Sequence, residues 1–429
     1  MTPSAQIQSA MDVCQQIFDQ ATIPADKIMN TFFRNNRYIG AKDKRAIATY
    51  VYEALRFVPR YQRVTDLDAR LLMLMILVHE KKQSLNDLHL LCSGDRYAPD
   101  VLSRHEIKQL ETPFQPNEAE VLAIPEALYP FFIESMPLQT LQELARSYET
   151  EASIDLRVNS LKASRDTVLQ TLICEGFEAT KTPHSPLAIR LKRRQSLDHH
   201  PLFTNGTIDV QDEGSQLLAL ACGAESHMNV LDYCAGAGGK TLALAAQMKN
   251  KGQLFACDIH EWRLKRARER VKRADVHNVR FYAADDGKFL KRHTKFFDRV
   301  LVDAPCSGTG TWRRNPDMKF KTTPQDIDEL RMLQRSILTK AAPLVREWGW
   351  LIYATCSVLK AENDDQIAWF LENHPEFKIA SGNHPAEGIY WGDLRHHLSM
   401  PGMDTMGLQL FPHVHATDGF YVTVLVRQQ

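Results

Sequence analysis

The spacing of apolar residues divides the chain into three stretches that predict different structures. From the start to about residue 120, apolar residues recur at intervals of three and four, which is the spacing that buries one face of an α-helix. Residues 42–58 and 68–80 have this pattern most clearly and predict buried helices of a bundle. We therefore expect residues 1–120 to form an all-helical domain.

The pattern changes between residues 121 and 215. Two further helical segments come first, and then short segments with alternating and β-branched residues, typical of strands, flank another helix. In chain order these segments are residues 124–136, 138–150, 153–160, 164–176 and 187–192. They predict a small mixed α/β subdomain over residues 121–215.

From residue 216 onward, short apolar strands alternate with helices, which is typical of a doubly wound parallel sheet. The expected fold class is α/β, with a Rossmann-like sheet over residues 216–429. Ligands of such sheets bind beyond the carboxyl ends of the strands, so we look for functional residues there. The predicted strands are residues 229–235, 252–258, 279–285, 299–305 and 350–356, and an antiparallel edge strand at residues 420–427.

Length and charge add two constraints. A chain of 429 residues is too long for one ordinary core, which agrees with several domains. Lysine plus arginine and aspartate plus glutamate both number 52, so the whole chain gives no electrostatic argument for nucleic acid, and any basic surface must be local. For the longest basic run a solvated helix face is the more common meaning. The candidate basic segments are Lys192 to Arg194, Arg263 to Arg273, and Arg313 with Arg314.

The sequence also predicts a compartment. No stretch approaches the run of about 20 apolar residues that spans a bilayer, and the first residues lack the basic start and apolar stretch of a signal peptide. The eight cysteines are scattered and form neither a disulfide framework nor a zinc pattern. We expect a cytoplasmic protein, without a membrane or metal partner, that is monomeric.

A glycine-rich turn follows the first strand of the predicted sheet. Glycines between a strand and a helix let the backbone approach a ligand and open the helix N-terminus toward it. Alone this signal is weak, because nicotinamide, flavin and S-adenosylmethionine sites all use such a turn, and a tight turn can also bind nothing. The residues of this turn are Cys234, Ala235, Gly236, Ala237, Gly238, Gly239 and Lys240.

Acidic residues at the next two strand ends strengthen the prediction of a cofactor site. The second strand ends in Asp258, where a carboxylate can accept hydrogen bonds from both hydroxyls of a ribose. The third ends in Asp285 and Asp286, where a carboxylate or a backbone amide could meet an adenine amino group. Each aspartate alone is as often a helix N-cap as a ligand. Their common position at successive strand ends favours a ligand.

Two cysteines lie at the ends of the fourth and fifth strands. Cys306 follows Asp303 in the sequence Asp-Ala-Pro-Cys, and Cys356 ends the next strand. A single cysteine is usually a core residue, but two at matched strand ends favour chemistry. A thiolate that adds to carbon 6 of a cytosine makes carbon 5 nucleophilic enough to accept a methyl group, and a base must then remove the carbon 5 proton. Asp303 can bond to the amino group and ring nitrogen 3 of that base, which selects cytosine over uracil.

These residues lie in motifs through which the chain resembles the Sun-type (Fmu-like) RNA cytosine-5 methyltransferases, most closely those of small-subunit ribosomal RNA. The two cysteine blocks, in this order and at this spacing, are highly specific. The motifs cover nearly all of residues 121–427. They are Leu156 to Lys162, Val210 to Leu217, Leu231 to Thr241, Asp303 to Asp317, Tyr353 to Asn363, and Phe411 to Val422.

The resemblance implies a function for each part of the site. It implies that Cys356 is the nucleophile and that Cys306 assists release, whereas DNA cytosine methyltransferases use the cysteine of the fourth strand as nucleophile. It also implies that S-adenosylmethionine is the cofactor and that RNA is the partner. Asp286 is preferred over Asp285, because the family has Asp-Gly there. The implied cofactor-binding residues are Cys234 to Lys240, Asp258, Asp286 and Asp303.

One departure of the chain from the family matters. The first motif usually reads Ala-Pro-Gly-Gly-Lys, and Ala237 stands in place of the proline, so we expect a change in loop stiffness and not a loss of binding. Over residues 1–120 the resemblance rests on the pattern of residues 42–56 and implies a NusB-like RNA-binding domain.

Three alternatives remain open at this point. The catalytic motifs do not encode the target, so a transfer-RNA cytosine methyltransferase is one alternative. A non-catalytic RNA-binding factor of ribosome assembly is another, although it has no need for two strand-end thiols. A nicotinamide dehydrogenase would leave both cysteine blocks unexplained.

Overall fold

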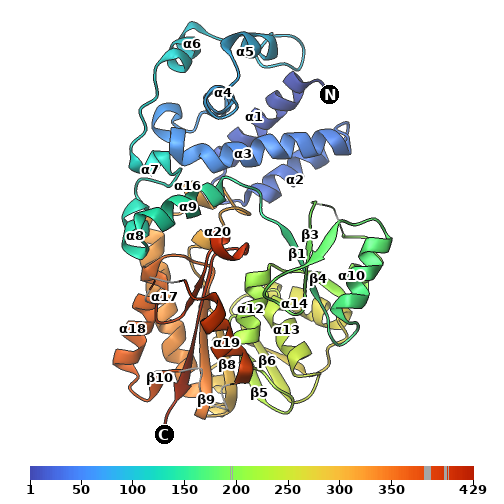
Figure 1. Cartoon of the computed structure of the whole chain (residues 1–429), viewed down its shortest axis with the longest axis vertical. Coiled ribbons are helices and arrows are strands. Elements are labelled where there is room, and N and C mark those ends of the chain that lie inside the picture. Colours follow the sequence, from blue (N-terminus) through green and yellow to red (C-terminus); the bar gives the residue numbers. More distant parts are fainter. Residues whose placement is uncertain (194, 196, 381–387, 401–402, 404) are drawn as a thin grey trace. The chain divides into compact units, whose positions relative to one another are not determined.

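The computed structural model describes all residues of the chain except 194, 196, 381–387, 401–402 and 404 (Figure 1). Arg194, a candidate for a basic surface, thus lies outside the described residues. The chain forms two compact units: a helical unit of Met1–Glu151 and Thr311–Pro324, and a sheet unit of Ala152–Gly310 and Gln325–Gln429. The three domains proposed above, with boundaries at residues 120 and 215, remain a prediction.

The helical unit confirms the helical pattern of the first stretch. The segment predicted at residues 42–58 lies within the long helix α3, and the segment at residues 68–80 is the almost wholly buried helix α4. Apolar side chains at intervals of three and four meet in one core, for example Ile47, Val51 and Leu72. The helices are α1 (Pro3–Asp19), α2 (Ala25–Asn35), α3 (Ala41–Thr65), α4 (Ala69–His79), α5 (Leu85–Leu91), α6 (Arg104–Glu111), α7 (Glu118–Val121), α8 (Tyr129–Ser135), α9 (Leu138–Tyr148) and α16 (Met318–Lys321).

The segment Thr311–Pro324 packs into the helical unit although it comes from the middle of the chain. Trp312 is fully buried there, with ring centroids 5.2 Å from Phe132 and 5.5 Å from Tyr148. Lys319 is also fully buried, and its ammonium donates to the carbonyls of Arg56 at 3.2 Å and Ala123 at 3.1 Å. This segment is therefore part of the core of the unit and not a surface loop.

A small antiparallel sheet begins the sheet unit. Its strands β1 (Ile154–Val158) and β3 (Ala188–Leu191) are the two predicted for this stretch, and helix α10 (Arg165–Cys174) lies between them in the chain. The strand order is β2-β3-β1-β4. The remaining elements are β2 (Ala179–Lys181), α11 (Pro201–Thr204), β4 (Ile208–Val210) and α12 (Glu213–Ala221).

The large sheet has the order β10-β12-β9-β8-β5-β6-β7, with β11 paired to β12. Strands β5 to β9 are parallel, as predicted, and β12 (Phe420–Arg427) is antiparallel to β9. The prediction that β12 is an edge strand is wrong, because the short strand β10 (Phe377–Ile379) pairs with its other side. The parallel strands are β5 (Asn229–Asp232), β6 (Gln253–Asp258), β7 (Val279–Ala283), β8 (Phe297–Asp303) and β9 (Val345–Thr355).

Successive strand residues of this sheet point to opposite faces, and each face is covered by its own core. Val230 and Leu254 belong to a core with helices α12, α13, α14 and α19, whereas Leu231 and Phe255 belong to one with α15, α17 and α18. Figure 1 shows α12 and α13 on one side of the strands and α17 and α18 on the other. Their bounds are α13 (Gly239–Gln247), α14 (Glu261–Arg273), α15 (Gly287–Arg292), α17 (Pro324–Ala341), α18 (Asp364–Asn373), α19 (Gly388–Leu398), α20 (Pro412–His415) and β11 (Leu408–Leu410).

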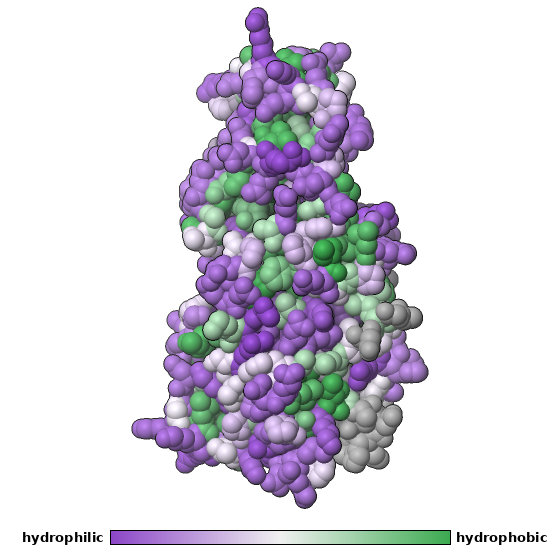
Figure 2. Space-filling view, turned by 90° about the vertical axis from the view of Figure 1, so that its left-hand side faces the viewer, coloured by the Kyte–Doolittle hydropathy of each residue, from purple (hydrophilic) through white to green (hydrophobic). Residues whose placement is uncertain are grey.

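The described residues contain no helix that is both long and apolar enough to cross a membrane. On the face drawn in Figure 2, hydrophilic residues predominate, and the hydrophobic ones form small separate patches. All eight cysteines are free thiols. In the described ranges, no group of three or more His, Cys, Asp or Glu side chains could hold a metal ion.

Candidate active site

The carboxyl ends of β5, β6, β8 and β9 bring the predicted site residues to one edge of the large sheet. The register pairs Asp232 of β5 with Ala256 of β6, and Asp303 of β8 with Ala354 of β9. Beyond the strands, the N–H of Ala304 still donates to the carbonyl of Ala354 at 2.8 Å. The sheet itself therefore fixes the spacing between the turns that follow these strands.

The glycine-rich turn after β5 depends on two left-handed glycines. Gly236 has φ +55° and Gly238 has φ +82°, a region that side chains other than glycine adopt at a cost. A Cβ at Gly238 would lie 3.0 Å from the Cβ of Ala267 on α14, so the turn packs closely on that helix. A Cβ at Gly236 would meet nothing within 4 Å, so open space lies beside this residue.

Asp258 lies at the end of β6 and holds the turn in place. One carboxylate oxygen accepts from the N–H of Gly236 at 2.9 Å, and the other accepts from the N–H of His260 at 2.8 Å. The residue is 5% exposed, and Arg263 lies 3.7 Å from its carboxylate. Asp258 thus joins the ends of β5 and β6.

Asp286 lies at the end of the third strand but has different partners. Its carboxylate caps α15, where it accepts from the N–H groups of Lys288 at 2.9 Å and Phe289 at 3.2 Å. This helix-cap role was one of the two possibilities that the sequence left open. Whether Asp286 also binds a ligand stays a prediction.

Lys240 and Asp303 form an ion pair between the glycine-rich turn and the end of β8. The ammonium and the carboxylate are 2.6 Å apart, and their side chains are 11% and 29% exposed. Burial lowers the pKa of Lys240, but the charge and the hydrogen bond of Asp303 outweigh it and hold the pKa above its ordinary value. Lys240 therefore keeps its positive charge, and the ion pair orients Asp303 at the edge of the site.

The thiols of Cys306 and Cys356 are in contact. Their sulfur atoms are 3.3 Å apart, and the N–H of Cys356 donates to the sulfur of Cys306, also at 3.3 Å. The hydrogen bond to Cys356 is the main cause that raises the pKa of Cys306 well above its ordinary value, and burial adds to it. The structure thus brings together the two cysteines that the sequence placed at neighbouring strand ends.

The other cysteines have different surroundings. Burial raises the pKa of Cys14 to about 12, and it raises the pKa of Cys222, Cys234 and Cys257 as well. Cys174 is exposed at the end of helix α10, which contacts strands β2 and β3 of the small sheet. Only Cys306 and Cys356 pair with another thiol in the hydrogen bonds of the described residues.

Sequence reasoning missed two acidic residues that shape the site. Glu362 is fully buried and accepts from the N–H of Ser307 at 2.8 Å and from the side-chain amide of Gln334 at 3.1 Å. It thereby fixes the loop that carries Cys306. Its place in the same motif as Cys356 was visible in the sequence, but its contact with the other motif was not.

Asp232 at the end of β5 is the second missed residue. It is fully buried, its Oδ2 accepts from the hydroxyl of Thr241 at 2.6 Å, and its Oδ1 has no partner within the described residues. Burial raises the pKa of Asp232 to about 7. Its position directly before the glycine-rich turn was the available signal.

The basic run on α14 is only partly the solvated face that its sequence suggests. Lys265, Arg266 and Lys272 are exposed, but Arg270 donates to the carbonyl of Ala237 at 2.8 Å and pairs with Asp209. Arg270 therefore supports the glycine-rich turn at the position where the family has proline.

The chain is similar to known proteins in both sequence and structure. Residues 218–426 match the family model described as 16S rRNA methyltransferase RsmB/F, and residues 124–198 match a ferredoxin-like domain of RsmF/B-like methyltransferases. The crystal structure of PH0851 superposes on the whole chain with a TM-score of 0.78 at 25% identity, covering 99% of that protein. A methyltransferase homologue from Pyrococcus horikoshii superposes with a TM-score of 0.59 at 26% identity, over 76% of this chain and all of that one.

Two proteins, each named probable ribosomal RNA small subunit methyltransferase B, are similar to this chain in sequence. The one from Bacillus subtilis is 34% identical over 70% of this chain, and the one from Synechocystis is 32% identical over 71%. The chain spans 65% and 67% of the length of these relatives. Strand order and the turn after β5 define a Rossmann-like methyltransferase fold. Within that class, the chain belongs to the RsmB/F methyltransferase family.

Proposed function

We propose that this protein transfers a methyl group from S-adenosylmethionine to carbon 5 of a cytosine in small-subunit ribosomal RNA, through a covalent adduct with Cys356. The observation that carries the proposal is the contact between two thiols, 3.3 Å apart, at the ends of adjacent parallel strands. A binding protein gains nothing from such a pair. A cytosine methyltransferase needs both a nucleophile and a group that helps to release it.

The residues at the strand ends fit S-adenosylmethionine. The open space beside Gly236 admits a ligand, the buried Asp258 is an acceptor at the end of β6, and the unpartnered Oδ1 of Asp232 can take a further donor. When bound, the cofactor supplies an electrophilic methyl group. We propose that Cys234 to Lys240, Asp258, Asp286 and Asp303 line its site.

Cys356 is proposed to attack carbon 6 of the cytosine. Cys306, whose pKa is raised well above its ordinary value, stays protonated and can donate its S–H to a thiolate at Cys356. The new bond between sulfur and carbon 6 pushes an electron pair toward ring nitrogen 3, which takes up a proton from solvent. Asp303, held by Lys240, accepts hydrogen bonds from that N–H and from the amino group of the base.

Cys306 is proposed to act in the release step. Once Cys356 is bonded to carbon 6, its sulfur carries no charge and is a weaker hydrogen-bond acceptor, so both causes that Cys356 contributes to the raised Cys306 pKa weaken, while burial remains. Cys306 can then release its S–H proton to solvent and, as a thiolate, accept the proton that leaves carbon 5. The electron pair of that C–H bond restores the double bond between carbons 5 and 6, the Cys356 thiolate is expelled, and ring nitrogen 3 returns its proton to solvent. Glu362 acts as a positioning residue, because it fixes the loop of Cys306 through the N–H of Ser307.

The names of the relatives support ribosomal RNA of the small subunit as the substrate, and we place the protein in the cytoplasm as a monomer. The test is bisulfite sequencing of total RNA from cells with and without the gene. We expect one cytosine of small-subunit ribosomal RNA to lose its protection from conversion when the gene is absent. Loss of protection only in a transfer RNA would support the proposed reaction but assign transfer RNA as the substrate. No change in any RNA would contradict the proposal.

A further inference from the structure

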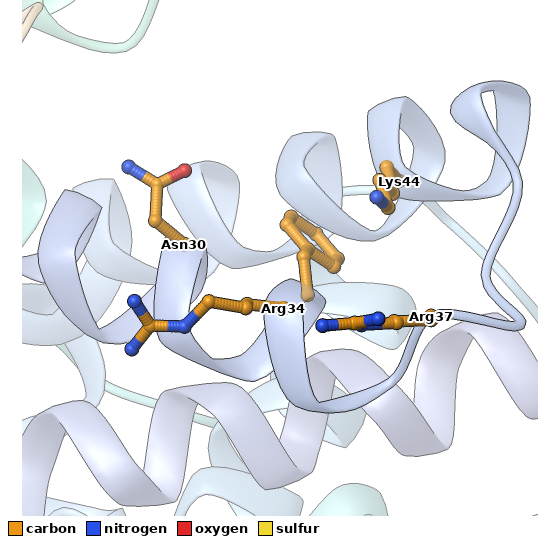
Figure 3. A pocket seen from close by; sticks show the side chains of 5 residues that line it. Asn30, Arg34, Arg37 and Lys44 are labelled. Carbon is orange, nitrogen blue, oxygen red and sulfur yellow. The ribbon is translucent and has the colours of Figure 1, made fainter.

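A basic hollow lies on the helical unit, at the end of α2 and the start of α3. It has a volume of about 430 Å³ and is lined by Asn30, Phe33, Arg34, Arg37 and Lys44. A water molecule occupies about 30 Å³ in the liquid, so this hollow has room for much more than one small ion. Figure 3 shows Asn30 and Arg34 on α2, Arg37 on the loop after it, and Lys44 on α3.

The cations of the hollow lack acidic partners. In the part of the chain that the structure describes, neither Arg34 nor Arg37 nor Lys44 forms an ion pair. The two aspartates of residues 25–45 are engaged elsewhere: Asp26 accepts from the hydroxyl of Tyr52, and Asp43 accepts from Gln6 and the N-terminal amine. The positive charge of the hollow is therefore available to a ligand.

Basic residues are concentrated in this segment. Residues 25–45 contain six basic and two acidic side chains, whereas the whole chain has 52 of each. A local excess on a chain of zero net charge is the distribution expected of a surface that binds a polyanion. The basic segments named from the sequence above do not include this one, because its charges are spaced along a helix and a loop and come together only in the fold.

The chemistry of the lining residues fits a nucleic-acid backbone. The planar forks of two arginines match phosphate oxygens, and the amide of Asn30 can bond to a phosphate or a ribose hydroxyl. The ring of Phe33 is half-buried and lies 5.8 Å from the ammonium of Lys44, so an aromatic face is present among the cations. Unpaired bases of RNA stack on such rings.

We propose that this hollow, formed by Asn30, Phe33, Arg34, Arg37 and Lys44, binds the phosphate backbone of a single-stranded segment of the RNA substrate, separate from the methylated nucleotide. This inference rests on the proposed function, because it takes RNA as the substrate. The hollow contributes affinity for the substrate and takes no part in the methyl transfer.

The test compares the full-length protein with the triple variant Arg34→Ala, Arg37→Ala, Lys44→Ala. Affinity for a fragment of small-subunit ribosomal RNA is measured by fluorescence anisotropy at several salt concentrations. Loss of three phosphate contacts should weaken binding about 10- to 100-fold at 0.1 M salt and lower the slope of log K against log salt by about 2. Because these side chains lie at the surface, the thermal unfolding midpoint should not change.

The matched control removes three cations elsewhere on the same unit, by Arg96→Ala, Arg104→Ala and Lys108→Ala. These residues are exposed and outside the hollow, and the control should keep the affinity and the slope of the wild type. Equal losses in both triple variants, or none in the first, would overturn the proposal. So would displacement of the RNA by polyglutamate at equal charge concentration, since that would indicate an acidic protein as ligand.

The proposed function can fail separately. If the wild-type protein leaves cytosine unmethylated but the first variant loses RNA affinity and salt slope, the function is wrong and the RNA site stands. If the wild type methylates cytosine and the first variant binds RNA as tightly as before, the site is wrong and the function stands.

Discussion

One continuous motif, Asp303 to Asp317, is divided between the two units of this protein, and its halves do different work. Residues up to Gly310 stay at the end of β8, where the N–H of Gly310 donates to the carbonyl of Cys356 at 3.0 Å. Residues from Thr311 onward belong to the helical unit, where Trp312 fills the core. The first half therefore holds the Cys306 thiol at the site, and the second half packs into the core of the helical unit.

The two halves of the motif therefore need their particular residues for different reasons. In the first half, polar groups remain partly exposed at the sheet edge, as Asp303 and Cys306 do, because they must meet a ligand. In the second half, Trp312, Arg313 and Asp317 are buried. Two residues beyond the motif, the buried Lys319 donates to backbone carbonyls. Changes in the second half should therefore affect stability, and changes in the first should affect binding and chemistry.

The largest stability effect is expected for Trp312→Ala. Removing a fully buried indole between Phe132 and Tyr148 should lower the free energy of unfolding of the helical unit by about 3 to 5 kcal/mol. Urea unfolding followed by circular dichroism measures it. Trp348, which is 57% exposed, provides the control, and Trp348→Ala should change the free energy by less than about 0.5 kcal/mol. Equal effects would mean that Trp312 is not a core residue.

Lys319 should make stability depend on pH. Burial lowers its pKa from 10.5 to about 7, so between these values the unfolded chain binds a proton that the folded chain does not. Stability should therefore rise as the pH is raised from 7 toward 10, by about 1 to 4 kcal/mol from this group. Urea unfolding at pH 7 and pH 9.5 tests this, and Lys319→Met should remove the rise. A variant with the same pH dependence as the wild type would show that another group causes it.

Asp258→Ala should weaken S-adenosylmethionine binding by about 1 to 3 kcal/mol, because an acceptor for the ribose and the support of Gly236 are both lost. The variant Asp286→Ala is compared with it, because the Asp286 carboxylate caps α15 and its role in cofactor binding is untested. If that cap is its main role, the variant should lose about 1 kcal/mol of stability and bind the cofactor with little change. Calorimetry measures both affinities. Unchanged affinity in the Asp258 variant would remove Asp258 from the site.

The smallest effect concerns the departure of the glycine-rich turn from its family. Gly236 has a left-handed backbone, so Gly236→Ala should cost about 1 kcal/mol even though its Cβ would meet nothing within 4 Å. Proline at position 237 would favour an extended residue 236. Because the structure holds residue 236 left-handed, the double change Gly236→Ala, Ala237→Pro should be more destabilising than the first change alone. Thermal unfolding of the single and double variants checks this, and a smaller loss in the double variant would contradict it.

The strand ends of the large sheet were predictable because their signals are local. An apolar run that stops at an acid, a glycine turn or a cysteine predicts both the strand and its end. Strands β5, β6 and β8 begin and end close to the predicted positions, whereas β9 ends close to its predicted end but begins at Val345, before the predicted start at residue 350. The contact between Cys306 and Cys356 followed from the parallel order of β8 and β9.

The rest depended on contacts between distant residues. Nothing in Trp312 or Lys319 indicates which core they enter, because burial is decided by the partners that surround them. The strand β10 has three residues, too few for a periodic pattern, so β12 was expected at the edge. The hydrogen bonds by which Asp286 caps α15, and the one that Glu362 accepts from the N–H of Ser307, also form only in the folded chain.

The most direct test of the account separates the two thiols by their adducts. Wild type and the variants Cys356→Ala and Cys306→Ala are incubated with substrate RNA and S-adenosylmethionine labelled in the methyl group, and run on a denaturing gel. The control is Cys174→Ala, which should behave as the wild type because Cys174 is an exposed thiol outside both cysteine motifs.

Cys356→Ala should give neither methyl transfer nor a slow-migrating band, with a loss of activity of at least about 1,000-fold, because the nucleophile is gone. Cys306→Ala should accumulate a slow-migrating band of protein joined to RNA that carries the label, because attack and transfer proceed but release fails. An adduct that survives the loss of Cys356 and disappears with the loss of Cys306 would contradict the assignment of the two thiols. No adduct in either variant, while the wild type methylates cytosine, would contradict the covalent mechanism itself.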